Sequence, residues 1–343
     1  MNKNITLIGF IYTLGMKKIS FKRGIIFLMV LLWSFKFSAQ SYRFYYELRY
    51  APDSTQKEIK KTELYILDYD TQTNESLFYS NSHIKNDSIN KRLSSMMNLS
   101  SITVNMGDFK DSYINEIIEK KDSEYNIYSI IDGDFFTYKQ DIDIKWKIEN
   151  EKLEILEYEC ISAETDFGGR KWKAYYTADL PFASGPYKFG GLPGLILKIS
   201  DEDKDFEFTI AGINKIENST SFNFSKYIPT NENKYVNQYK LYVEDPVKSM
   251  REGVIITEDG TKYFMKGGIE KSIIEEEQKS IYDDMRKNNN CLEKDSKICT
   301  IQRQVLSKLK KDRFPPQSYK IVFNRNKGEI KFNNFLGLRL ILY

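Results

Sequence analysis

Residues 170–200, RKWKAYYTADLPFASGPYKFGGLPGLILKIS, contain two strand patterns joined by a segment rich in proline and glycine. Over residues 171–176, Trp172, Ala174 and Tyr176 alternate with more polar side chains, and an apolar run follows at 195–199. Alternation with a period of two is typical of a strand that has one buried face. We therefore predict two strands of one sheet with a compact connection between them.

The connection contains five residues that favour bends, namely Gly185, Pro186, Gly191, Pro193 and Gly194. Pro193 fixes φ at about −65° at the second position of a turn, and Gly194 can adopt the positive φ that a type II turn requires at the third. We predict such a turn, which directs the chain into the strand at 195–199. An anion or ligand site is the alternative, although a phosphate-binding loop would need a Gly-Lys-Ser/Thr ending and a following helix.

The same alternation recurs on both sides of this segment. The chain has 24 Tyr and 22 Phe residues, and aromatic side chains favour strands. Helical spacing is found at residues 86–98 and in a helical hairpin at 270–312. We predict an α+β fold that is mainly antiparallel β, in which a large twisted sheet packs its aromatic face on a few helices. Further curling of this sheet into a half-barrel is the alternative to an open sheet. Further strands are expected at residues 42–50, 64–67, 77–80, 125–131, 135–138, 142–148, 153–163 and 206–213.

Residues 1–40 have the features of a secretion signal peptide. From Met16 they read MKKISFKRGIIFLMVLLWSFKFSAQ, a basic start, an apolar stretch and small residues near a cleavage site. The apolar stretch is shorter than the roughly 20 residues that span a bilayer. We expect an exported protein that is periplasmic, outer-membrane-associated or secreted, with residues 41–343 as a single domain and no membrane span after cleavage. An uncleaved membrane hairpin that also uses residues 5–14 is the alternative.

Charge argues against a nucleic-acid partner. The chain has 51 Lys and Arg against 48 Asp and Glu, but six of the cations and none of the acids precede Ser41. The remaining chain has a net charge of −3, and a mildly acidic surface does not attract nucleic acid or an anionic membrane.

Few residues have the chemistry of a metal or cofactor site. His83 is the sole histidine, so zinc sites with several histidines cannot form within the chain, and we expect it to be exposed and without a catalytic role. Asp201, Asp203 and Asp205 have the spacing of a calcium loop, but Phe206 and Gly212 occupy the positions that need Gly and Glu. We interpret this stretch as a solvated turn and predict no metal and no cofactor.

Three cysteines occur in the chain, and an exported protein meets an oxidising compartment. Cys291 and Cys299 bracket the connection between the helices of the predicted hairpin, and we predict a disulfide between them. Cys160 is then left in a strand, where it is expected to be buried; a reactive thiol is the alternative.

The stretch at residues 170–200 resembles the GLPGLI family of exported proteins, named for the hexapeptide at residues 191–196. The resemblance extends over residues 146–201, including Trp146 and the stretch from Gly185 to Phe189. Tyr175 is a departure, because the family often has tryptophan there. The family has no established activity, so the resemblance implies export and fold but no chemistry.

Two hypotheses for the function follow. The first is a non-enzymatic envelope or secreted protein that binds an apolar ligand or an envelope protein on a concave aromatic face, or has a structural role; it predicts an aromatic-lined cavity. The alternative is an envelope hydrolase that uses carboxylates with Tyr and Arg; it predicts a cleft with two carboxyl groups of strongly shifted pKa near Arg170 or Tyr187. Catalytic residues are not identified. The candidate binding residues are Arg170, Trp172, Tyr175, Tyr187 and Lys188.

Overall fold

The computed structural model describes residues 41–96, 101–103, 112–121, 124–256, 262–265, 268–309, 318–324 and 329–336. The predicted signal peptide at residues 1–40 lies outside these residues.

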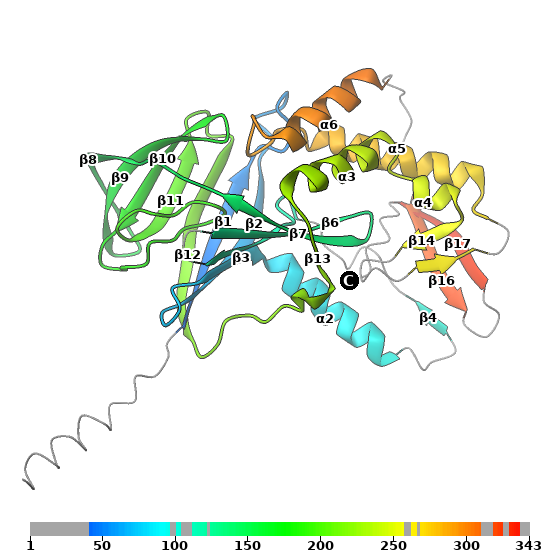
Figure 1. Ribbon diagram of the computed structural model, residues 1–343, viewed down its shortest axis with the longest axis horizontal. Helices are drawn as coiled ribbons and strands as arrows, with labels where there is room; N and C mark the ends of the chain where they lie inside the picture. The colour runs from blue at the N-terminus through cyan, green and yellow to red at the C-terminus, as the bar shows by residue number, and fades with distance from the viewer. Residues whose placement is uncertain are drawn as a thin grey trace, which may run out of the picture. The chain divides into compact units, whose positions relative to one another are not determined.

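A single open sheet of twelve strands dominates the structure (Figure 1), which confirms the predicted fold class. Its order is β13-β7-β6-β5-β3-β2-β1-β12-β11-β10-β9-β8, and the pairs are antiparallel except that of β13 with β7. The strands are β1 (Ser41–Tyr50), β2 (Lys61–Asp70), β3 (Ser76–Ser80), β5 (Ile117–Lys121), β6 (Glu124–Ile131), β7 (Asp134–Asp141), β8 (Lys147–Ile155), β9 (Tyr158–Phe167), β10 (Arg170–Thr177), β11 (Leu195–Asp201), β12 (Phe206–Ile216) and β13 (Ile228–Pro229).

The core of the sheet begins with the alternation of β1. Phe44, Tyr46 and Leu48 are fully buried on one face, where the main apolar cluster lies. Tyr46 also donates a hydrogen bond from its hydroxyl to the carbonyl of Ile196 at 2.7 Å, so its polar end is satisfied inside the core. As predicted, the strands on either side of the proline- and glycine-rich connection, β10 and β11, pair directly.

Helices cover both faces of the sheet. Tyr65 and Leu67 of β2 belong to the main cluster, whereas Ile66 between them packs with Ile84 of α2 on the opposite face, because successive strand side chains point to opposite sides. On the main-cluster face, α3 packs on β6 and β7, and α6 packs on α3 and α5 (Figure 1). The helices are α2 (Asn81–Met96), α3 (Glu232–Glu244), α4 (Lys248–Arg251), α5 (Lys271–Lys287) and α6 (Lys297–Lys308).

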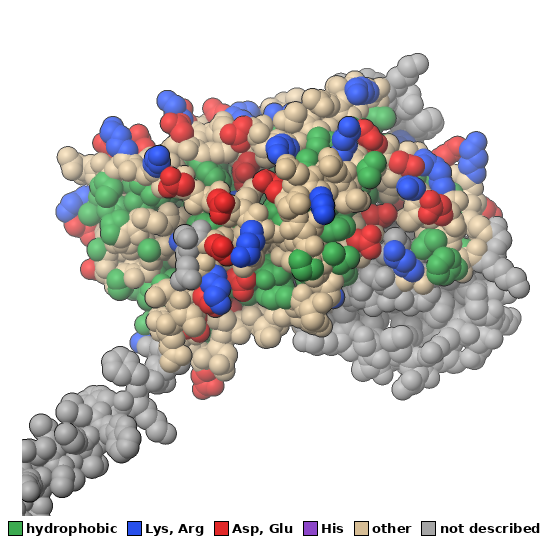
Figure 2. All heavy atoms as spheres, viewed as in Figure 1, with side chains coloured by type: hydrophobic (Ala, Val, Ile, Leu, Met, Phe, Trp, Pro, Cys, Tyr) green, Lys and Arg blue, Asp and Glu red, His purple; other side chains and the backbone are tan. Residues whose placement is uncertain are grey.

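The predicted helical hairpin is present as α5 and α6, and the predicted disulfide between Cys291 and Cys299 closes its connection. Within the described residues, no helix is both long enough and apolar enough to span a membrane. Two small sheets complete the fold: β14 (Val254–Ile256) with β15 (Lys262–Phe264), and β17 (Glu329–Leu336) with β16 (Ser318–Asn324) and β4 (Ser101–Thr103). On the face in Figure 2, side chains of both charges are interspersed.

The turn at Pro193 is tighter than predicted. Gly194 has a positive φ of 153°, and a Cβ atom there would lie 2.0 Å from the carbonyl oxygen of Thr177. The N–H of Gly194 donates to the carbonyl of Leu192 at 2.8 Å, so the hydrogen bond closes a three-residue turn rather than the four-residue type II turn. The requirement for glycine thus comes from close backbone contact as well as from φ.

The prediction that His83 is exposed is wrong. The helix α2 begins at Asn81, five residues before the expected start, so His83 lies in its first turn and is 7% exposed. Its Nε2 is 3.0 Å from the carbonyl oxygen of Asn115, and its ring packs edge-on to Phe222. The residues around His83 in the sequence are mostly polar, and such a stretch is typical of an exposed segment, so the sequence did not indicate its burial.

Candidate functional site

A cavity of about 680 Å³ lies between the main-cluster face of the sheet and the helices α3, α5 and α6. Its lining is rich in phenol rings and carboxylates and has few ammonium groups. The tyrosines are Tyr50, Tyr113, Tyr138, Tyr187, Tyr235, Tyr239 and Tyr242; the acids are Glu63, Glu116, Asp132, Glu232, Glu277, Asp284 and Glu293; the lysines are Lys61, Lys188 and Lys297.

Two of the predicted binding residues, Tyr187 and Lys188, line this cavity together. The Tyr187 hydroxyl donates a hydrogen bond to the Glu293 carboxylate, and the Lys188 ammonium lies 2.5 Å from the same oxygen. Tyr187 has a φ of 55°, a left-handed conformation that is rare for a bulky aromatic residue. Such strain persists only where the surroundings enforce it, and it is frequent at functional sites. Here the surroundings of Tyr187 include Phe189, whose ring is buried. The backbone N–H of Phe189 donates a hydrogen bond to the carbonyl of Pro186 at 3.1 Å, which closes a turn around Tyr187.

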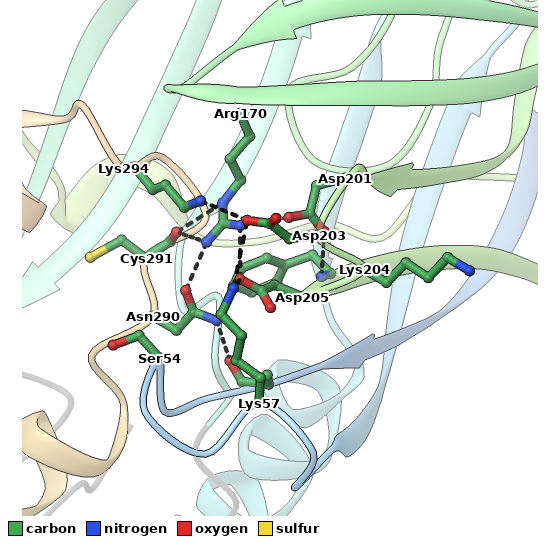
Figure 3. A network of polar contacts seen from close by, with 12 residues as sticks. Ser54, Lys57, Arg170, Asp201, Asp203, Lys204, Asp205, Asn290, Cys291 and Lys294 are labelled. Atoms are coloured by element: carbon green, nitrogen blue, oxygen red, sulfur yellow. Dashed lines mark hydrogen bonds and ion pairs between the residues drawn. The ribbon is translucent and has the colours of Figure 1, made fainter.

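Glu293 is held in the cavity by the disulfide-closed connection between α5 and α6, and Arg170 anchors that connection (Figure 3). The Arg170 side chain is 1% exposed, and it donates to the side-chain oxygen of Asn290 and to the carbonyl of Cys291, each at 2.8 Å. It also donates to the carbonyl of Leu292 at 3.1 Å. Arg170 is therefore a positioning residue behind the cavity rather than a residue that faces a ligand.

Two glycines allow the connection to approach this closely. A Cβ atom at Gly168 would lie 2.8 Å from the Glu293 side chain, and one at Gly169 would lie 3.2 Å from the backbone nitrogen of Asp295. The N–H of Lys294 donates to the carbonyl of Gly168 at 2.6 Å. The connection between α5 and α6 thus packs directly on the Gly-Gly turn between β9 and β10.

Asp201 at the end of β11 and Asp203 and Asp205 in the turn after it are part of the same anchor. Carboxylate oxygens of Asp201, Asp203 and Asp205 lie within 4.8 Å of one another. Arg170 contacts Asp201 at 2.6 Å and Asp205 at 3.2 Å, while Lys57 lies 2.9 Å from Asp205. Lys294 pairs with Asp203, so three cations balance three acids, and this set of groups suits an ion-pair network rather than a metal ion.

The interpretation of this stretch as a solvated turn is wrong for two of the three aspartates. Asp201 and Asp205 are buried, and only Asp203 is exposed. Burial raises the pKa of Asp201 despite the nearby Arg170. Burial has the same tendency at Asp205, but hydrogen bonds from Lys57 and Arg170 hold the pKa of its carboxyl below the usual value. The ion-pair network was hidden in the sequence because its cations come from distant segments.

The part of the cavity next to α3 contains a second polar group of residues. The rings of Tyr138 and Tyr235 stack with centroids 4.6 Å apart. Gln140 donates from Nε2 to Glu232 at 3.0 Å, while its buried Oε1 has no hydrogen-bond partner among the described residues. Burial raises the pKa of Glu116, against the opposing effects of its own backbone N–H and of Lys188. No sequence signal pointed to these residues, because α3 was not predicted and Glu116 precedes β5 in no recognisable pattern.

Comparison with known proteins gives one family match. Residues 169–198 match the family described as "Protein of unknown function (Porph_ging)". This stretch includes Arg170, Tyr187, Lys188 and the turn at Pro193. Among curated proteins, none matches the chain.

Three solved structures are distantly similar to this chain. Two crystal forms of PNGF-II, in space groups C2 and P21, are 16% and 14% identical with TM-scores of 0.41 and 0.38. Each alignment covers 58% of this chain, which spans about a third of the PNGF-II chain (32% and 33%). An uncharacterized conserved protein from Thermus thermophilus is 9% identical with a TM-score of 0.30, over 57% of this chain and 92% of that one. These identities and TM-scores are too low to indicate a function for this chain.

The other two predicted binding residues lie outside the cavity. Trp172 is a core residue that is 1% exposed; its ring packs on Phe189, and its Nε1 donates to the carbonyl of Phe167 at 2.9 Å. Tyr175 points to the opposite side of β10, where its hydroxyl donates to Glu151 at 2.5 Å. Cys160 is fully buried, and burial raises the pKa of its thiol to about 11, which does not favour a reactive thiolate.

Proposed function

We propose that this chain is an exported binding protein that takes up a small polar ligand in the tyrosine-lined cavity. The observation that carries the proposal is a cavity of about 680 Å³ into which hydroxyl, carboxylate, amide and ammonium groups converge. Ligand sites in proteins typically measure roughly 300–1,000 Å³ and combine rings with a few placed polar groups.

The lining favours a polar ligand over the apolar one that the sequence suggested. The phenol rings offer flat apolar surface, but Gln140 Oε1, which has no hydrogen-bond partner among the described residues, needs a donor if water is displaced. An apolar molecule would leave this atom unpaired, and an unpaired buried polar group costs about 1–3 kcal/mol. A ligand with polar groups that match the lining avoids this cost.

Export and membership of the GLPGLI family are part of the same proposal. The support is the basic, apolar and small-residue order of the first 40 residues and the match at residues 169–198 to a family of unknown function. Mass spectrometry of the full-length chain after expression in a host with a secretion pathway tests the export. Cleavage near residue 40 and recovery outside the cytoplasm are expected, and an intact N-terminus in the cytoplasmic fraction would contradict it.

A fragment screen tests the binding function. Crystals of the protein are soaked with small amines, amino acids, monosaccharides, carboxylates and apolar aromatics, and the same fragments are examined by saturation-transfer NMR. At least one polar fragment should occupy the cavity, in contact with Tyr187, Lys188 or Glu116. Fragments found only on the outer surface, or no bound fragment of any class, would refute the proposal.

A second candidate function, the envelope hydrolase, is favoured by one observation. Glu116 and Glu293 both line the cavity with Tyr187, and a carboxyl group with a raised pKa can act as a general acid. The test is a panel of chromogenic esters and glycosides. Turnover that is lost in Glu116→Gln but kept in the surface variant Glu58→Gln would support hydrolysis, and no turnover of any substrate would count against it.

A further inference from the structure

The part of the cavity that lies next to α3 has an excess of hydrogen-bond acceptors. We define this acceptor end by Glu116, Tyr138, Gln140, Glu232 and Tyr235. Tyr138 and Gln140 are two residues apart on β7 and so share one face, while Glu232 and Tyr235 are three apart on α3 and lie on one side of that helix. The hydrogen bond from Gln140 to Glu232 and the stacking of Tyr138 on Tyr235 join the strand to the helix.

Two acceptors of this group remain available. The Oε1 atom of Gln140 is buried and accepts no hydrogen bond from the described residues. Rotating the amide does not relieve this, because the nitrogen must face the carboxylate of Glu232. A buried polar atom without a partner requires an explanation, and a bound water or ion is one of the usual ones. The donor group of a ligand can take the same place.

Glu116 is the second acceptor, because its carboxylate interacts with backbone N–H groups, its own and that of Asn115, but has no cationic partner in the described part of the chain. Within the described residues, no side-chain nitrogen of Lys, Arg or His lies within 4.0 Å of its carboxylate. Lys188 is near enough to influence its pKa, but the Lys188 ammonium contacts Glu293 at 2.5 Å. Two other carboxylates of the cavity have side-chain donors: Glu63 accepts from the hydroxyl of Tyr65 at 2.8 Å, and Glu293 accepts from Tyr187.

The rings beside these acceptors suit a cation. The ammonium group of a ligand is attracted to the face of a tyrosine ring, and the attraction grows when water is excluded. The hydroxyl of Tyr235 is already engaged with Ser129 at 2.8 Å, which fixes the ring pair. The whole lining also carries seven carboxylates against three lysines.

Resting on the proposed binding function, we propose that the ligand is an organic cation, an amine whose ammonium group binds in the acceptor end among Glu116, Gln140 and the Tyr138–Tyr235 ring pair. The ammonium donates hydrogen bonds to the Glu116 carboxylate and to Gln140 Oε1. An anionic ligand would meet the excess of carboxylates, and a neutral one would leave Glu116 without a counter-charge.

Three five-carbon probes that differ in charge test the inference by isothermal titration calorimetry: 1,5-diaminopentane, 1,5-pentanediol and glutarate. The diamine should bind saturably and more weakly at high salt, the diol should bind at least tenfold more weakly, and glutarate should not bind. Glu116→Gln should lower the affinity for the diamine at least tenfold, which corresponds to about 1.4 kcal/mol. The matched control Glu58→Gln, an exposed residue outside the cavity, should leave the affinity unchanged.

A second variant keeps the test decisive if Glu116→Gln fails to fold. Gln140→Met removes the Oε1 acceptor at similar size and should also weaken the diamine. Equal binding of the diol, binding of glutarate, or an unchanged affinity in either folded variant would overturn the cation inference. If the fragment screen places a neutral or anionic fragment in the cavity, the binding function stands and only its ligand class is wrong; an empty cavity in that screen would remove both.

Discussion

The burial of His83 makes a prediction that the chain is well suited to test, because it has no second histidine. Burial lowers the pKa of His83 from 6.5 to about 4. The neutral imidazole is thus the form that is favoured in the buried site next to the carbonyl of Asn115. A difference of this size between the folded and the unfolded chain corresponds to roughly 3 kcal/mol of folding free energy.

The sign of the effect follows from proton binding. Between pH 4 and 6.5 the unfolded chain protonates His83 and the folded chain does not, so the unfolded chain binds more protons. The free energy of unfolding therefore rises with pH through this window. The contribution is fully present above about pH 6.5 and is lost as the pH falls to about 4.

Two measurements check this reasoning. The single imidazole resonance in proton NMR should not titrate in the folded protein above about pH 5. Urea unfolding at pH 7 and pH 4.5 should show that His83→Gln, which removes the titrating ring, loses less stability on acidification than the parent chain, by roughly 2 kcal/mol. An imidazole that titrates near pH 6.5 in the folded protein, or an identical pH dependence in the variant, would refute the burial of this residue.

Three further predictions concern the parts that hold the cavity together, and urea unfolding monitored by circular dichroism measures each. Arg170→Leu removes the partner of two buried carboxylates and should cost about 3–5 kcal/mol, whereas a loss below about 1 kcal/mol would contradict the ion-pair network. Gly194→Ala places a methyl group against the carbonyl of Thr177 and should prevent stable folding; a normal transition in this variant would contradict that close contact. Replacing Cys291 and Cys299 with alanine opens a short loop and should cost about 2–3 kcal/mol, and equal stability of the parent with and without reductant would argue against the disulfide.

The architecture could be predicted from the sequence because strands and helices depend on patterns of residues that are close together in the chain. The alternation of Phe44, Tyr46 and Leu48 indicates a strand with one buried face, and this holds whichever strands lie beside it. The positions of Cys291 and Cys299 between two helical patterns likewise predict a disulfide that closes the connection, and the structure contains this disulfide. Such signals depend on residues near one another in the chain.

The site could be predicted only in part, because it is built from distant segments. Tyr187 and Lys188 were found since they lie in the proline- and glycine-rich segment, but their partner Glu293 comes from more than 100 residues later. Arg170 is a candidate binding residue in the sequence, yet its side chain contacts carbonyls of the α5–α6 connection instead of a ligand. No pattern of neighbouring residues predicts contacts between segments that are so far apart in the chain.

The position of β1 in the middle of the sheet has a consequence for how the chain is assembled. This first strand pairs with β2 on one edge, but its other edge pairs with β12, so that Tyr42 lies opposite Lys215. During synthesis one edge of β1 therefore stays unpaired until about 170 further residues exist. Contacts this distant slow folding, and an unpaired edge invites association with other chains. A chaperone that shields nascent strands would serve this protein at that stage.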